Sequence, residues 1–247
     1  MTKTLNSRAF IGCFLLAGGL IQSGEILATE PEHKIGNWIG VTSATRFDDR
    51  WSLFLQGELR TWEFASNVNE TLFRVAGLYD FSKKYSGAFG YVRVDTWPYQ
   101  ETGLEKFDEN RIYEEFKIKT GWRTTKIDQR FRLEHRWITT PEMGTQYSTR
   151  ARYKLQFKLP LNNDTFEPGT WYLSVLDEVF VDLDRNDYYF EFARGDRGLN
   201  QNRLNVSLGH KLTPLSGFTI GMLWQHRPNS DFWRLLLGYS HNFDLRD

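Results

Sequence analysis

Apolar and polar residues alternate with a period of two along most of the chain after Glu30. In the segment 127–137 (IDQRFRLEHRW), for example, Ile127, Phe131 and Trp137 share one face and charged residues occupy the other. Successive side chains of a β-strand point to opposite faces, whereas an amphipathic helix repeats every 3.6 residues. The alternation therefore predicts an all-β fold.

The alternating runs are mostly about 10 to 13 residues long, whereas an ordinary strand has about 5 or 6. A tilted strand needs this greater length to cross a lipid bilayer, and bacterial single-chain barrels have even strand numbers. We therefore predict a transmembrane antiparallel up-and-down β-barrel of about twelve strands. The expected strands lie near 36–47, 50–61, 70–81, 85–96, 109–121, 125–138, 147–159, 170–181, 187–194, 200–211, 217–227 and 232–243.

All seven prolines lie between these segments or at their ends. Proline cannot donate a hydrogen bond to a β-ladder, and a closed barrel has no free edge to accommodate it. The prolines therefore support the segmentation.

The lengths of the connections between the expected strands agree less well with those of a bacterial barrel. With a periplasmic N-terminus, the first connection is extracellular and the second is a short periplasmic turn. Here residues 47–50 form a short connection, whereas 62–69 and 97–108 are long. Either a strand is miscounted near the N-terminus or the longer connections face the periplasm.

The mean hydropathy of −0.53 excludes a helical membrane protein, because each spanning helix needs roughly 20 nearly uncharged apolar residues. It is compatible with a membrane barrel, in which lumen-facing polar residues alternate with lipid-facing apolar ones. The aromatic content of 16% suits β-structure and the aromatic girdles of such barrels. Composition alone leaves one alternative open, a large soluble periplasmic β-domain that binds a ligand.

The N-terminus resembles a secretory signal peptide. Lys3 and Arg8 precede an apolar run at 9–21, which is too short for a membrane-spanning helix. We expect a signal peptide at 1–28, one barrel domain at 29–247, and location in the Gram-negative outer membrane. The only cysteine, Cys13, lies in the apolar run, so the mature chain has neither disulfides nor thiolate metal sites.

The formal net charge is zero, but residues 111–158 contain twelve Lys or Arg and five Asp or Glu. A charged side chain that faces lipid near the bilayer midplane costs about 2–4 kcal/mol, so these residues are expected to face the lumen. The predicted basic wall consists of Arg111, Lys117, Arg130, Arg132, Arg136, Arg150, Arg152 and Lys154, with Lys119 and Lys158 beside it. The expected acidic partners are Glu115, Asp128, Glu134 and Glu178.

Two interpretations of this charged lumen remain open. In the first, the basic wall attracts small anionic solutes or sets the selectivity of a porin-like channel. In the second, arginine–carboxylate networks fill or constrict the narrow lumen. The opposite side would then be supplied by Arg93, Asp95, Asp177, Glu178, Glu191 and Arg203.

No catalytic motif is present: the chain has no G-x-S-x-G, no H-E-x-x-H and no phosphate-binding loop. The five histidines have no metal-ligand spacing, and we expect no cofactor. Export separates the protein from nucleic acid. An outer-membrane enzyme that modifies lipid or lipopolysaccharide is the alternative to a non-enzymatic barrel, and it would depend on His226 or His241 at the rim.

Several short motifs resemble an uncharacterised bacterial family. They are residues 129–136 (QRFRLEHR), 150–153 (RARY) and 177–180 (DEVF), together with Trp38 and the pair 50–51 (RW). They resemble the domain of unknown function 2490 family, whose members are regarded as outer-membrane barrels. The resemblance covers roughly 36–243 and implies fold and location, with no known activity or substrate. The implied partners are outer-membrane lipid and the barrel-assembly machinery.

Overall fold

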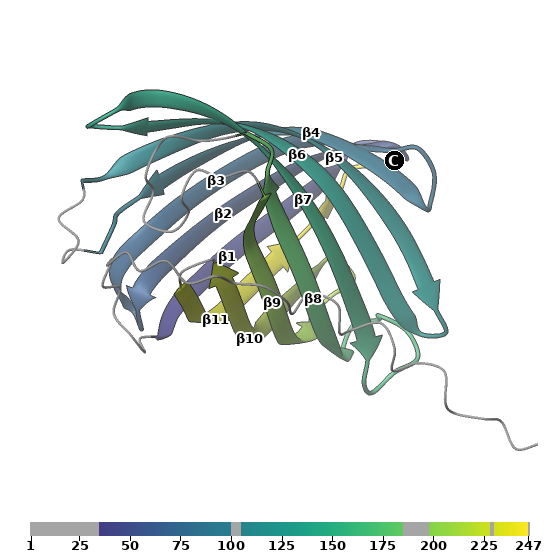
Figure 1. Ribbon diagram of the computed structural model, residues 1–247. Coiled ribbons are helices and arrows are strands. Elements are labelled where there is room, and N and C mark those ends of the chain that lie inside the picture. Colours follow the sequence, from purple (N-terminus) through teal and green to yellow (C-terminus); the bar gives the residue numbers. More distant parts are fainter. Residues whose placement is uncertain (1–34, 100–104, 185–197, 228–229, 247) are drawn as a thin grey trace, which may run out of the picture.

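Eleven long strands form one closed wall in the computed structural model, which describes residues 35–99, 105–184, 198–227 and 230–246 (Figure 1). The strands are tilted and wrap around a common axis. They are β1 (Ile35–Arg46), β2 (Trp51–Glu63), β3 (Ser66–Asp80), β4 (Tyr85–Thr96), β5 (Phe107–Trp122), β6 (Thr125–Thr140), β7 (Gly144–Pro160), β8 (Trp171–Asp182), β9 (Gly198–Lys211), β10 (Ser216–Arg227) and β11 (Ser230–His241). None of the described residues belongs to a helix long and apolar enough to cross a membrane.

Each strand is antiparallel to the next from β1 to β11, and the wall is closed by a parallel pairing of β1 with β11. The register of this seam runs from Ile35 opposite Trp233 to Thr42 opposite Ser240. A short strand, β12 (Phe243–Asp244), continues beyond β11 and pairs with Thr45 and Arg46. The start of β1 and the end of β11 therefore lie at opposite ends of the barrel.

The expectation of an even, wholly antiparallel barrel is wrong. With eleven strands, the first and last run in the same direction, so their closing ladder must be parallel. The strand expected at 187–194 lies outside the described residues. In the described wall, β8 pairs directly with β9, and Asp182 lies opposite Gly198.

The long connection expected at 62–69 is also wrong. β2 continues to Glu63 and β3 begins at Ser66, so only residues 64–65 connect them. The register shifts between Arg60 and Thr61, as at a β-bulge, and Ala65 has a positive φ of 54°. The bulge interrupts the period-two pattern while the ladder continues, so the alternation ends before the strand does.

Burial is the reverse of that in a water-soluble protein. Large apolar side chains on the outer face are exposed, among them Phe89 at 61% and Phe131 at 47%. Charged side chains inside the wall are buried, with Glu134 at 0% and Arg132 at 4%. The predicted separation into an apolar outer face and a charged lumen is present.

A small apolar cluster occupies the lumenal side of β3, β4 and β5. It contains Leu72, Ala76, Val92, Val94 and Tyr113, all of which are 4% exposed or less. The ring of Tyr113 lies against Gly90, where a Cβ atom would be 2.7 Å from ring atoms and 2.7 Å from the Cβ of Ala76. Glycine at position 90 therefore allows a tyrosine ring to fit flat against the wall.

The tight turn between β1 and β2 is organised by Asp48. The backbone N–H groups of Arg50 and Trp51 both donate to its Oδ1 at 2.7 Å. These hydrogen bonds, that from Trp51 first, lower the pKa of the Asp48 carboxyl below its ordinary value. The short connection at 47–50 is therefore a well-defined turn, at the same end of the barrel as β12.

The parallel seam predicts a disulfide between cysteines introduced at Ile39 and Leu237, which are directly opposite across β1 and β11. In a Cys13→Ser background, oxidised Ile39→Cys/Leu237→Cys protein should migrate differently on a denaturing gel, and reductant should reverse the change. Ile39→Cys/Ile220→Cys is the control, because β11 separates these positions and adjacent strands lie about 4.8 Å apart. A folded protein in which the seam pair never oxidises would contradict the parallel closure.

The fit at Gly90 predicts that Gly90→Ala destabilises the barrel by about 1–3 kcal/mol, because the added methyl group forces Tyr113 or Ala76 to move. Gly77→Ala is the matched control, since a Cβ atom there meets nothing within 4 Å. Urea midpoints of folding in detergent would measure both. Equal midpoints for the two variants would show that the contact is not tight.

Candidate functional site

The lumenal faces of β5, β6, β7 and β8 bring most of the charged residues together. On β6, the successive inward positions are Arg130, Arg132, Glu134 and Arg136. The register places Arg132 opposite Arg152 of β7, and like charges directly opposite each other destabilise a sheet. Carboxylates from the neighbouring strands must therefore compensate for them.

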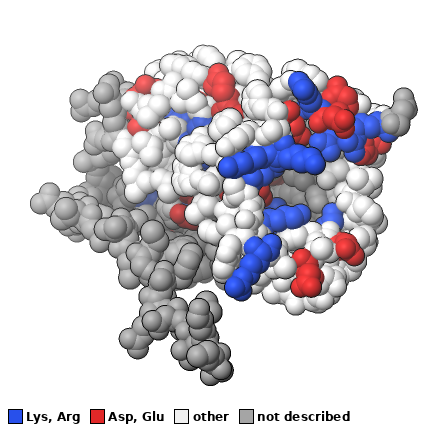
Figure 2. All heavy atoms as spheres, turned by 90° about the vertical axis from the view of Figure 1, so that its right-hand side faces the viewer, with Lys and Arg blue, Asp and Glu red and all other residues white. Residues whose placement is uncertain are grey.

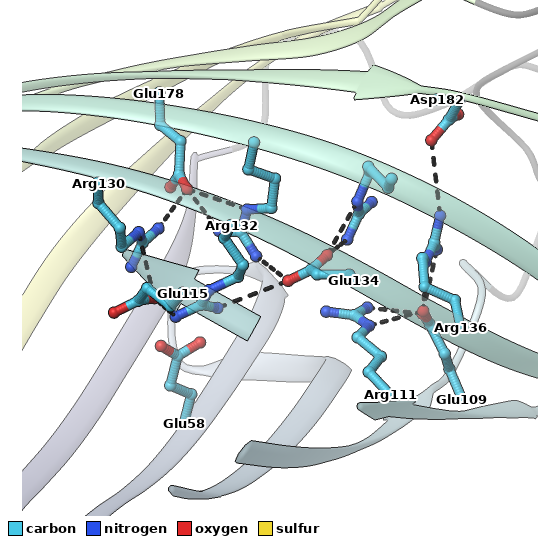
Figure 3. Close-up of polar contacts among 12 residues, drawn as sticks. Glu58, Glu109, Arg111, Glu115, Arg130, Arg132, Glu134, Arg136, Glu178 and Asp182 are labelled. Carbon is cyan, nitrogen blue, oxygen red and sulfur yellow. Dashed lines mark hydrogen bonds and ion pairs between the residues drawn. The ribbon is translucent and has the colours of Figure 1, made fainter. Parts of the chain in front are cut away.

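Glu134 is the centre of this network (Figure 3). Its side chain is 0% exposed and accepts hydrogen bonds from Arg150 Nε at 3.0 Å and Arg150 Nη2 at 2.6 Å. Arg152 donates to its other oxygen, and Arg132 Nη1 lies 3.5 Å from that same oxygen. One buried carboxylate therefore neutralises three guanidinium groups in part.

Two further carboxylates connect the network across the wall. Glu178 of β8 accepts from Arg152 Nε at 2.9 Å and also from Arg130. Glu115 of β5 accepts from Arg132 Nε at 2.7 Å. Arg130 also lies 3.6 Å from Glu115, so it connects β5 to β8 (Figure 3).

A second group lies nearer the end of the barrel at which β1 starts. Glu109 of β5 accepts two hydrogen bonds of 2.6 Å from Arg111 and is also paired with Arg136. Arg136 Nη1 lies 3.9 Å from Asp182 of β8. Carboxylates therefore accompany the arginines in both groups of this wall.

Aromatic rings in the lumen lie beneath the guanidinium groups. Arg132 lies 4.1 Å from the ring centroid of Tyr113, and Arg152 lies 4.3 Å from that of Phe180. Arg203 lies 4.7 Å from Phe180 and 4.9 Å from Trp38. A desolvated cation over a ring is stabilised by about 2 kcal/mol or more, so the rings partly replace the lost solvent.

A cavity of about 560 Å³ remains beside the network. Eleven basic and five acidic side chains line it, so the cavity has a surplus of positive charge. Lys154 and Lys158 are among these basic side chains, and neither forms an ion pair with any of the described residues. The end of the barrel where the C-terminus lies is visibly hollow, with Lys and Arg around and within the hollow (Figure 2).

The predicted basic wall lies on the lumenal side, and its charges are arranged largely in pairs. Seven of its eight members form ion pairs, the exception being Lys154: Arg111, Lys117, Arg130, Arg132, Arg136, Arg150 and Arg152. Among the expected acidic partners, Glu115, Glu134 and Glu178 belong to the network. Asp128 forms no ion pair within the described part of the chain.

Three residues expected on the opposite side of the lumen do not face it. Arg93 alternates with the buried lumenal residues Val92 and Val94, and Asp177 alternates with the lumenal Glu178. Both therefore lie on the outer face, as does Asp95, which pairs with Arg93. The expectation that these three side chains face the lumen is therefore wrong. Glu191 lies outside the described residues.

The sequence alone missed Glu109 and the group formed by Arg60, Glu58 and Glu70, which line the cavity. It also missed the aromatic rings beneath the arginines. The available signal was an aromatic residue at a lumenal position, such as Tyr113 between Arg111 and Glu115 in the inward series.

The rim histidines do not come together. His226 Nδ1 lies 2.7 Å from Asp231 across the β10–β11 pair, and the ring of His241 packs 4.7 Å from that of Phe243. The register places these two histidines at opposite ends of β10 and β11. The described residues contain no group of three potential metal ligands.

These features define a closed β-barrel with a densely charged, partly filled interior. A family model described as "Protein of unknown function (DUF2490)" matches residues 35–235, so the chain belongs to this family. The match confirms the resemblance of the short charged motifs. No curated protein and no solved structure matches the chain.

The network predicts that Glu134→Gln destabilises the barrel by about 3–5 kcal/mol, because three buried guanidinium groups lose a shared counter-charge. Glu142→Gln, on an exposed turn, is the control and should leave the urea midpoint unchanged. Adding Arg150→Gln to Glu134→Gln should restore part of the loss, since it removes one uncompensated cation. An unchanged midpoint for Glu134→Gln alone would contradict the central role of this carboxylate.

Proposed function

We propose that the protein is an exported, non-enzymatic β-barrel of the bacterial outer membrane whose lumen is a narrow passage for small anions. One observation leads to this proposal. A cavity with a surplus of basic side chains lies inside a closed wall whose outer face is apolar.

The apolar outer face supports a membrane location. Exposed apolar side chains occur on strands all around the wall, including Val41, Leu55, Phe73, Val206 and Trp233. In water this surface would cost roughly 25 cal/mol per Å² of apolar area, whereas lipid tails solvate it. A signal peptide at 1–28 would deliver the chain to the envelope, where the assembly machinery inserts barrels.

The electrostatics of the lumen support anions as the solutes. The paired arginines and glutamates fill the β5–β8 side, which narrows the passage without closing the cavity. Eleven basic side chains line that cavity against five acidic ones, which gives it a surplus of positive charge. In a low-dielectric enclosure such charge concentrates anions and repels cations. This role requires no cofactor, metal or nucleic acid.

Fractionation of the expressed protein and a gel mobility shift on boiling would test the membrane location. Conductance in planar bilayers would test the passage, with a reversal potential displaced toward that of chloride under a KCl gradient. The double variant Lys154→Gln/Lys158→Gln should reduce the anion preference, because it removes two basic groups from the cavity lining. Lys83→Gln, on an exposed turn, should not change it.

Folded, membrane-inserted protein that never conducts would refute the passage and leave the membrane barrel standing. Cation preference in the unmodified protein would contradict the electrostatic argument directly.

A further inference from the structure

The outer face of β5, β6 and β7 bears a polar trio, Glu114, His135 and Tyr147. His135 Nε2 lies 3.5 Å from Glu114 Oε2, and His135 Nδ1 lies 2.7 Å from the hydroxyl of Tyr147. Glu114 is on the face opposite the lumenal Glu115, and its side chain is 53% exposed. Glu114 is thus a half-exposed carboxylate on an outer face that is rich in apolar groups.

His135 lies between a carboxylate and a hydroxyl. Its Nε2 faces Glu114, and its Nδ1 faces the Tyr147 hydroxyl. No Lys or Arg of the described residues forms an ion pair with Glu114. A cation from outside the protein is the natural counter-charge.

An apolar groove of about 500 Å³ begins at Glu114. Ala151 lies in it, and larger apolar side chains surround it: Phe116, Phe131, Leu133, Tyr153, Val179 and Val181. The volume is within the range of about 300–1,000 Å³ found for small-molecule sites. The groove therefore offers space for a flexible hydrocarbon chain.

The trio lies beside aromatic residues of the kind found at membrane–water interfaces. Trp137 packs 5.4 Å from Tyr147, and Tyr91, on the adjacent outer face of β4, hydrogen-bonds to Asn110. Trp and Tyr collect at the level of lipid headgroups. These aromatic neighbours support a position near the lipid headgroups, and the groove extends from Glu114 across the outer face of β6, β7 and β8.

We propose that this face binds an aminophospholipid, with an acyl chain in the groove and the headgroup ammonium on Glu114. The inference depends on the membrane location in the proposed function, but not on conduction through the lumen. His135 and Tyr147 hold the carboxylate in place, and the ammonium supplies the missing positive charge and N–H donors.

Native mass spectrometry of the delipidated, folded protein in detergent would test the site. Dioleoyl phosphatidylethanolamine should bind at least about fivefold more tightly than dioleoyl phosphatidylglycerol, which has the same chains but no ammonium group. Glu114→Gln should remove this preference, and Ala151→Leu should weaken binding of both lipids by filling the groove.

Asp177→Asn is the matched control. Asp177 is also an outward carboxylate, but it accepts a hydrogen bond from Asn202 at 2.9 Å and does not line the groove. The preference should be unchanged in this variant. All four proteins should show the same mobility shift on boiling, which separates lipid binding from folding.

Equal binding of the two lipids, or a preference that survives Glu114→Gln, would overturn the site while leaving the membrane barrel intact. Loss of a dimer in Glu114→Gln, without any lipid preference in the unmodified protein, would assign the face to a second copy instead. Protein that does not insert into liposomes at all would overturn the proposed function, and the lipid site with it.

Discussion

Closure of the backbone hydrogen-bonded wall by the β1–β11 ladder is the constraint on which the rest of this structure depends. A sheet with a free edge leaves its backbone N–H and C=O groups unpaired, and these are costly in an apolar surrounding. Once the ladder is closed, every second residue must point into one enclosed space. With eleven strands, closure also requires the parallel seam, so the chain starts and ends its wall at opposite ends of the barrel.

Because the lumen is enclosed, each buried charge in it must be compensated by other lumenal groups. An isolated buried charge costs several kcal/mol, and the Coulomb attraction offsets this cost only where partners and hydrogen bonds are well placed. Glu134, Glu178 and Glu115 each contact two or more basic groups, and Arg130, Arg132 and Arg152 each lie between two of these carboxylates. The rings of Tyr113 and Phe180 give the same arginines an apolar support. The ion pairs and rings therefore fill one side of the lumen and leave a basic cavity beside them.

The inner and outer faces of β5 to β7 carry similar charged residues in different surroundings. Inside, carboxylates are shared among arginines and are buried. Outside, His135 lies 3.5 Å from Glu114, and an apolar groove lies next to the pair. This asymmetry results from the period of two, because Glu114 and Glu115 are neighbours in sequence but lie on opposite faces of one strand. One strand can thus carry a charged inner surface and a largely apolar outer surface.

By itself, the sequence determined the all-β class, the approximate position of the eleven strands β1 to β11 and the assignment of the basic wall to the lumen, because alternation reports which residues share a face. It could not determine where strands such as β3 begin, because the extra residue of the bulge, Asn69, disrupts the alternation there. Nor could it determine the strand number or the seam, which depend on pairing between residues about 200 positions apart. Only the tertiary structure decided which glutamate neutralises which arginine, because strand register and barrel curvature set those distances.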